Sequence, residues 1–117
     1  MPKREPQVKL LRQHLPQPSE ADILHAILDY LALRGITAWR VNSGATKIGD
    51  RYIRFGKKGM ADILGILKPN GRLLAIEVKR PGGRATPEQL AFLKQVNDAG
   101  GLGFVACSVE KVIEGLK

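Results

Sequence analysis

Two apolar segments separated by a short turn constrain the fold of this chain more than any other feature. Residues 61–67 and 72–79 are rich in isoleucine, leucine and valine, and residues 68–71 between them contain a proline and end in Asn-Gly. Apolar runs of this length on either side of such a turn predict a β-hairpin. Charged residues interrupt both predicted strands, so the arrangement of the hairpin decides where those charges lie.

The charged residues are Asp62 in the first strand and Glu77 and Lys79 in the second. If residues 68–71 form the loop, Asp62 lies opposite Glu77; if Asn70-Gly71 forms a tight two-residue turn, Asp62 lies opposite Lys79. Side chains alternate between the two faces of a strand, so Asp62 shares one face with Glu77 and Lys79 in either register. Directly opposed residues have Cβ atoms about 4.5–5.5 Å apart. Both registers therefore gather the three side chains in one small volume.

This gathering of charge is unfavourable unless something compensates for it. Two opposed carboxylates repel each other and, where they are partly buried, each raises the pKa of the other. A divalent cation removes that conflict, and hard oxygen ligands are those that Mg²⁺ selects. The alternative is an exposed strand face on which Lys79 neutralises the Asp62–Glu77 pair.

A helix is predicted over residues 20–34, with Ser19 as N-cap and Gly35 after its end. Glu20, in its first turn, is in line with apolar residues of the helix and is expected to point toward the core and the hairpin carboxylates. The alternative is that Glu20 only interacts with the helix macrodipole. The apolar residues recur at helical spacing: Ile23, Leu24, Ile27, Leu28 and Leu31.

Further strands are expected where β-branched, aromatic or apolar residues concentrate, at residues 36–42, 51–55 and 102–108. The last of these is expected to be fully buried, and residues 43–50, rich in Gly, Ser and Thr, are predicted to form a loop. We expect Trp39 and Cys107 to belong to the core. His14 and His25 lack the spacing of a histidine-based metal site.

A second helix follows Thr86, which is its predicted N-cap, and Gln89 completes a capping box. This helix closes at Gly100, and Ser108 caps a short final helix. Strands that alternate with helices in this way predict an α/β fold, with a mixed central sheet flanked by helices.

Composition narrows the class of protein and of partner. The chain has 117 residues, a net charge of +8 and a pI near 10.0, which favours nucleic acid as partner over a merely soluble basic surface. Its length predicts one domain, residues 18–117, after a flexible basic arm at residues 1–17. Cys107 is the single cysteine, which indicates a reducing, intracellular and cytoplasmic setting. No apolar run approaches the roughly 20 residues of a membrane span.

Several short motifs occur in order along the chain: Glu20, residues 39–44 (WRVNSG), residues 59–62 (GMAD), residues 76–79 (IEVK), residues 86–89 (TPEQ) and the pair Gly100-Gly101. Together they resemble the PD-(D/E)xK nucleases and, within them, the virus-type replication-repair nuclease (VRR-NUC) branch. The resemblance covers residues 19–114. The resemblance implies a restriction-endonuclease-like fold. It is also compatible with a virus-encoded protein that acts in a host cell. Ala61 departs from the broader signature, which often has proline there.

The resemblance also implies roles for individual residues. Asp62 and Glu77 would bind Mg²⁺ or Mn²⁺ with the Val78 backbone carbonyl, and Lys79 would orient the attacking water and stabilise charge on the phosphate. Glu20 would help to position the metal or its water shell. Gln89 would support the site, a role that its place in the capping box could explain without catalysis.

DNA contacts are expected from polar and basic residues that flank these strands, because glycine-bearing loops let phosphate come close. The resemblance implies a DNA endonuclease active on branched DNA such as four-way junctions, working as a homodimer. The competing interpretation is a basic nucleic-acid-binding module that keeps the fold but does not cut. The expected DNA-contacting residues are Arg40, Asn42, Ser43, Lys57, Lys58, Arg80 and Arg84.

Overall fold

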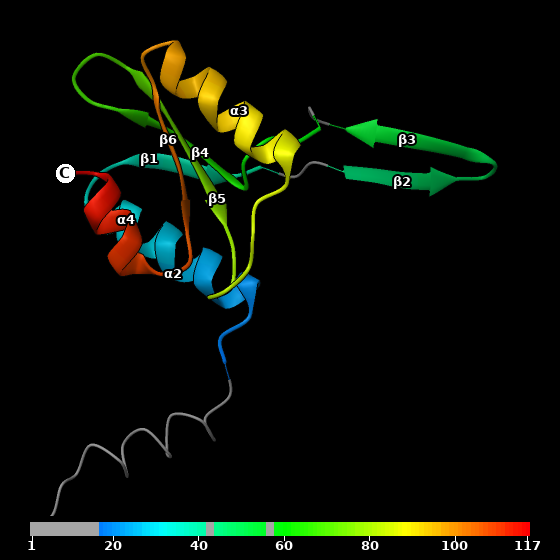
Figure 1. Cartoon of the computed structure of the whole chain (residues 1–117), viewed down its shortest axis with the longest axis horizontal. Coiled ribbons are helices and arrows are strands. Elements are labelled where there is room, and N and C mark those ends of the chain that lie inside the picture. The colour runs from blue at the N-terminus through cyan, green and yellow to red at the C-terminus, as the bar shows by residue number, and fades with distance from the viewer. Residues whose placement is uncertain (1–16, 42–43, 56–57) are drawn as a thin grey trace, which may run out of the picture.

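The computed structural model of the chain describes residues 17–41, 44–55 and 58–117 (Figure 1). The predicted arm, residues 1–17, lies outside this part of the chain except for Gln17. In chain order the elements are α2 (Glu20–Leu33), β1 (Thr37–Arg40), β2 (Gly44–Ile48), β3 (Arg51–Phe55), β4 (Ile63–Leu67), β5 (Arg72–Val78), α3 (Pro87–Asp98), β6 (Leu102–Ala106) and α4 (Val109–Gly115).

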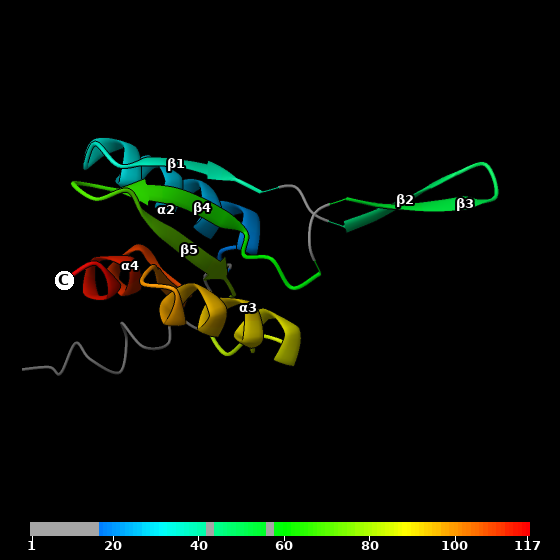
Figure 2. The same ribbon diagram turned by 90° about the horizontal axis from the view of Figure 1, so that it is seen from above.

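Four of the strands form one mixed sheet in the order β1-β4-β5-β6. The β1–β4 and β4–β5 pairs are antiparallel, whereas β5 and β6 are parallel and are joined through α3. Helices α2 and α4 pack on one face of the sheet and α3 on the other, as the two views together show (Figures 1 and 2). The predicted α/β fold is confirmed.

The central strand β5 divides its side chains between these two layers. Leu74, Ile76 and Val78 belong to the main core, which they share with α2 and α4. Ala75 faces the smaller cluster formed with Leu93 of α3. Because side chains alternate along a strand, Glu77 belongs to the same face as Ala75 and therefore to the α3 side.

The register of the β4–β5 hairpin selects one of the two predicted arrangements. Leu67 pairs with Arg72 and Ile63 with Ile76, so residues 68–71 form the loop and the tight two-residue turn is excluded. The backbone N–H of Gly71 donates to the Leu67 carbonyl at 2.9 Å and closes this loop. Asp62 immediately precedes Ile63, and Glu77 immediately follows Ile76. The register therefore sets the two carboxylates side by side.

The three predicted helix starts are confirmed. The Ser19 hydroxyl accepts the Asp22 N–H at 3.1 Å, and the Thr86 hydroxyl accepts the Gln89 N–H at 3.2 Å. Ser108 caps α4 in the same way. The predicted stripe of α2 is buried at Ile23, Leu24, Ile27 and Leu31, while Leu28 is partly buried.

The loop predicted at residues 43–50 is wrong, because Gly44–Ile48 forms β2 and pairs with β3. Ile48 pairs with Arg51, which leaves Gly49 and Asp50 as a two-residue turn, with Gly49 at φ +62°. A glycine at the first turn position is a known hairpin signal that the Gly/Ser/Thr composition obscured. Figures 1 and 2 show this two-stranded hairpin projecting from the main sheet.

Three expectations of burial are also wrong. Trp39 is 44% exposed, because β1 is an edge strand and α3 packs over β5 and β6 instead. Strand β6, the other edge, buries only Ala106 fully, and Val105 is 37% exposed. Cys107 follows β6 and is only partly buried.

Candidate active site

The site lies where β5 ends and β4 begins. The backbone N–H of Val78 donates to Asp62 Oδ2 at 2.9 Å, so the Asp62 side chain reaches across to the neighbouring strand. This bond also fixes Asp62 beside Glu77, the residue before Val78. Glu77 is 1% exposed and is the one buried charged residue in the part of the chain that the structure describes.

Each oxygen of the Glu77 carboxylate has a different environment. Oε1 accepts a hydrogen bond from the Gln89 side-chain amide at 2.9 Å and lies 3.5 Å from Lys79 Nζ. Oε2 is buried and has no hydrogen-bond partner among residues 17–41, 44–55 and 58–117. An unpartnered buried carboxylate oxygen is unfavourable, and native structures contain few such atoms.

This environment changes the protonation of Glu77. The pKa of Glu77 is raised from 4.5 to about 8. Burial is the largest cause. The charge of Asp62 and a hydrogen bond that the protonated carboxyl shares with the Asp62 side chain add to it, whereas Lys79 opposes them. Because Glu77 is buried, the interpretation of an exposed strand face is wrong, although the ion pair between Lys79 and Glu77 that it named is present.

A cleft with a volume of about 410 Å³ is lined by Lys79 together with Arg80 and Arg84. Lys79, which also pairs with Glu77, connects this cleft to the carboxylates, which do not line it themselves. Glu20 lines the same cleft from the first turn of α2. Glu20 is exposed, and it belongs to a helix on the opposite face of the sheet from Glu77. The expectation that Glu20 points toward the core and the hairpin carboxylates is therefore wrong, and Glu20 instead lines the cleft with Lys79.

The N-termini of α2 and α3 both point toward this end of the sheet, as the positions of Glu20 and Gln89 show. Their C-termini lie at the other end, where the first residue of β5 bonds to Gly100 and Gly101 (Figure 1). A helix N-terminus carries partial positive charge and unpaired N–H groups. Of these two helices, α2 contributes to the cleft lining, so its N-terminus adds partial positive charge there beside the negative charge of Glu20.

The model of the VRR-NUC domain family matches residues 18–111. The chain belongs to the VRR-NUC family. VRR-NUC is a nuclease family, and the fold described above agrees with that membership. No curated protein sequence matches the chain.

The VRR-NUC motif residues occupy the positions described above. Asp62, Glu77, Lys79 and Gln89 lie within one hydrogen-bonded group, and Val78 holds Asp62 through its N–H. Within the described ranges, no three His, Cys, Asp or Glu side chains lie close enough together to bind one metal ion. Glu20 therefore does not join Asp62 and Glu77 as a third ligand.

The predicted DNA-contacting residues divide into four groups. Arg80 and Arg84 line the cleft with Lys79. Arg40 is exposed at the end of β1 and pairs with Ile63, next to Asp62. Lys58 is exposed and pairs with Glu88 at 3.8 Å. The predictions for Asn42, Ser43 and Lys57 lie outside the described residues.

Gly59 is a residue whose role the sequence did not reveal. Its backbone has φ +81°, and a Cβ atom built on it would lie 2.6 Å from the Glu88 carbonyl oxygen. The segment that leads to Asp62 therefore packs directly against the first turn of α3, the turn that carries Gln89. Glycine allows both this conformation and this close approach.

None of the helices in the described ranges is long and apolar enough to span a bilayer.

Proposed function

We propose that this VRR-NUC domain is a metal-dependent DNA endonuclease whose cation is Mg²⁺ or Mn²⁺, held by Asp62, Glu77 and the Val78 backbone carbonyl. The observation that carries the proposal is the Glu77 carboxylate, which is buried beside Asp62 with one oxygen unpartnered. Lys79 lies 3.5 Å from the other oxygen of Glu77 and lowers its pKa, but burial and Asp62 raise that pKa further.

The residues present fit a hard divalent cation. Mg²⁺ commonly binds through one or two carboxylates and keeps several water ligands, so a third acidic side chain is not required. When bound, the cation would withdraw charge from the phosphate oxygens and acidify a water molecule. It would also return Glu77 to its ionised form, because a nearby positive charge lowers the pKa of a carboxyl group.

The remaining polar residues act on water, phosphate and ligand geometry. Lys79, which faces both Glu77 and the cleft, orients the attacking water and stabilises negative charge that develops on the phosphate. Gln89 fixes the orientation of Glu77 through its amide. Glu20 positions water at the edge of the cleft, since it lines the cleft without reaching the carboxylate pair.

DNA enters along the cleft. Arg80 and Arg84 contact phosphates next to the scissile bond, and Arg40 and Lys58 extend the basic surface on the β1 and α3 sides. Support for this path comes from the net charge of +8 and from the three basic side chains that line the cleft, Lys79, Arg80 and Arg84. The expected products carry 5′-phosphate and 3′-hydroxyl ends.

The proposed substrate is branched DNA, cut by a homodimer. A two-fold dimer would offer two copies of the site to two strands, as cleavage of a four-way junction requires. Branched DNA as substrate and a homodimer as the active form are both proposed from the family resemblance and from the presence of one such site in each chain.

The experiment is cleavage of linear, flapped and four-way DNA by wild type and Lys79→Ala, with Mg²⁺, with Mn²⁺ and with EDTA. The proposal predicts metal-dependent cutting, fastest on four-way DNA, and a loss of about 10²–10³-fold in Lys79→Ala with DNA binding retained. Binding of every substrate without cutting would identify a non-catalytic nucleic-acid-binding module instead. Equal cutting by Lys79→Ala would contradict the assigned site.

A further inference from the structure

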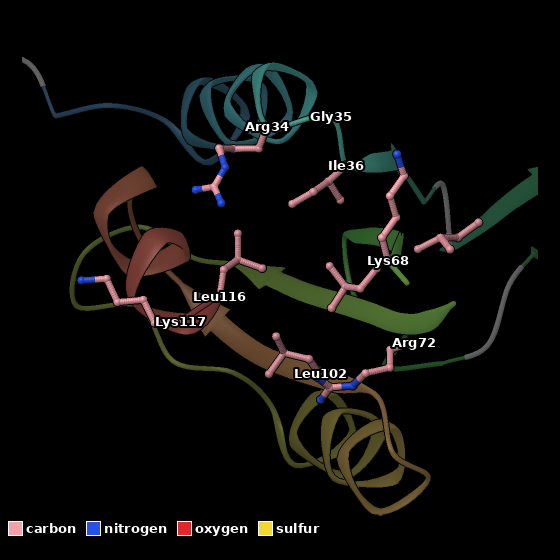
Figure 3. A pocket seen from close by; sticks show the side chains of 10 residues that line it. Arg34, Gly35, Ile36, Lys68, Arg72, Leu102, Leu116 and Lys117 are labelled. Atoms are coloured by element: carbon pink, nitrogen blue, oxygen red, sulfur yellow. The ribbon is translucent and has the colours of Figure 1, made fainter. Parts of the chain in front are cut away.

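A second pocket lies at the end of the sheet opposite the carboxylates, and Figure 3 shows it from close by. Its volume is about 450 Å³, within the range of pockets that hold cofactor-sized ligands. Four basic residues line it: Arg34, Lys68, Arg72 and Lys117. Apolar side chains that include Ile36 and Leu116 form its interior, and none of its lining residues is acidic.

Two of the four cations are held in place by the protein. Arg34 Nη1 donates to the Tyr30 hydroxyl at 2.8 Å, and its guanidinium lies 5.8 Å from the centre of the Tyr30 ring. Arg72 donates through Nε to the Gly100 carbonyl at 2.9 Å and through Nη2 to the Gly101 carbonyl at 3.2 Å. A guanidinium has five N–H donors, so each arginine keeps donors for a ligand.

Helix ends explain part of this charge. The helices α2, α3 and α4 all end near the pocket, and basic residues stabilise the carbonyl-rich C-terminus of a helix. Stabilisation of helix ends does not explain Lys68, which lies in the β4–β5 loop. It also does not explain why the interior of the pocket is apolar. In the described part of the chain no carboxylate pairs with any of the four cations.

Four cations without an acidic partner favour a ligand with two or more negative charges, which a phosphomonoester carries and a single carboxylate does not. The planar guanidinium groups suit phosphate oxygens, and the apolar interior suits a flat organic group. We propose that this pocket is a second site that binds a nucleoside monophosphate, with the phosphate on the cations and the base against the apolar interior. The site does not depend on the proposed nuclease function.

The test is calorimetric titration of the full chain with deoxyadenosine 5′-monophosphate in EDTA, which keeps divalent cations from the carboxylates. Deoxyadenosine and inorganic phosphate are titrated separately. The variants are Arg34→Gln and Lys68→Gln, both at exposed positions, and the matched control is Lys94→Gln on the exposed side of α3.

The proposal predicts saturable binding of the nucleotide, at least tenfold weaker binding of deoxyadenosine and of inorganic phosphate, and at least tenfold weaker nucleotide binding in each pocket variant. Lys94→Gln and the active-site variant Glu77→Gln should bind as wild type does. Equal affinity for inorganic phosphate, unchanged affinity in both pocket variants, or loss of binding in Glu77→Gln would each overturn it.

Discussion

The Gln89 side chain joins the start of α3 to the buried Glu77 carboxylate. Its amide nitrogen donates to Glu77 Oε1 at 2.9 Å, while its oxygen accepts the Thr86 backbone N–H at 2.8 Å. The sequence left open whether Gln89 serves the helix cap or the site. The structure shows that one side chain does both, so a helix cap sets the orientation of a carboxylate.

Gln89→Glu separates the two roles. A glutamate still accepts the Thr86 N–H and keeps the capping box, but it cannot donate to Glu77 and adds a negative charge beside it. We expect the melting temperature in EDTA to fall, because a third carboxylate joins Asp62 and Glu77, and the Mn²⁺ concentration for half-maximal cleavage to rise about tenfold or more, since outer ligand contacts commonly contribute 10–100-fold to metal affinity. Lys94→Gln, on the same helix, should leave that concentration unchanged. A Gln89→Glu protein with wild-type metal dependence would show that Gln89 only caps the helix.

The raised pKa of Glu77 predicts how the metal-free protein responds to pH. Its pKa is about 8 in the folded state against 4.5 as the ordinary value, so the folded state binds more protons between those pH values. Stability must therefore fall as pH rises from 4.5 toward 8, and the loss is complete above the folded-state pKa.

Thermal unfolding in EDTA checks this response. Glu77→Gln removes the titrating group, so its melting temperature should depend less on pH than that of wild type and should exceed it by several degrees at about pH 9. Glu110→Gln, at an exposed position of α4, should follow the wild-type curve. Parallel curves for wild type and Glu77→Gln would contradict the assigned burial of a charged group.

Much of the site was predictable because it depends on strand periodicity. Alternation places Asp62, Glu77 and Lys79 on one face whichever turn forms, so an error in the register could not separate them. The position of the Glu20 side chain was harder to predict. Helical periodicity set it in line with the core stripe, but at the first residue of a helix the side chain extends past the layer that the stripe covers.

Burial at the edges of the sheet could not be predicted from local patterns. Trp39 is apolar and lies in a strand, yet its exposure depends on α3 covering β5 and β6 and not β1. The close contact between Gly59 and the Glu88 backbone likewise joins segments that are far apart in the sequence. Such contacts follow from how the layers pack, which periodicity does not specify.

Gly59 and Gly71 provide a matched pair of substitutions. Both have positive φ, +81° and +74°, but a Cβ atom at Gly59 would meet the Glu88 backbone, whereas one at Gly71 meets nothing within 4 Å. We expect Gly71→Ala to cost about 1–2 kcal/mol of stability from backbone strain alone and to leave cleavage unchanged. Gly59→Ala should cost more and should also reduce the rate at saturating metal, because it displaces Asp62 relative to Gln89. Equal stability and equal cleavage rates in Gly59→Ala and Gly71→Ala would contradict the close contact between Gly59 and Glu88.

Arg84 is expected to contact a DNA phosphate from the cleft. Arg84→Gln should weaken binding of every DNA substrate by a similar factor and should reduce the slope of log affinity against log salt by about 1. Fluorescence anisotropy at several salt concentrations measures that slope. Lys94→Gln, which removes one charge outside the cleft, should keep the wild-type slope, and an unchanged slope in Arg84→Gln would exclude the contact.

The central claim is that Asp62 and Glu77 together hold a divalent cation. Anomalous scattering from crystals of the wild-type protein soaked with Mn²⁺ tests it most directly. The account predicts one strong peak within coordinating distance of both carboxylates and of the Val78 carbonyl, and no such peak in Glu77→Gln crystals treated in the same way. Wild-type crystals with no peak between Asp62 and Glu77, or with Mn²⁺ bound only elsewhere, would contradict it.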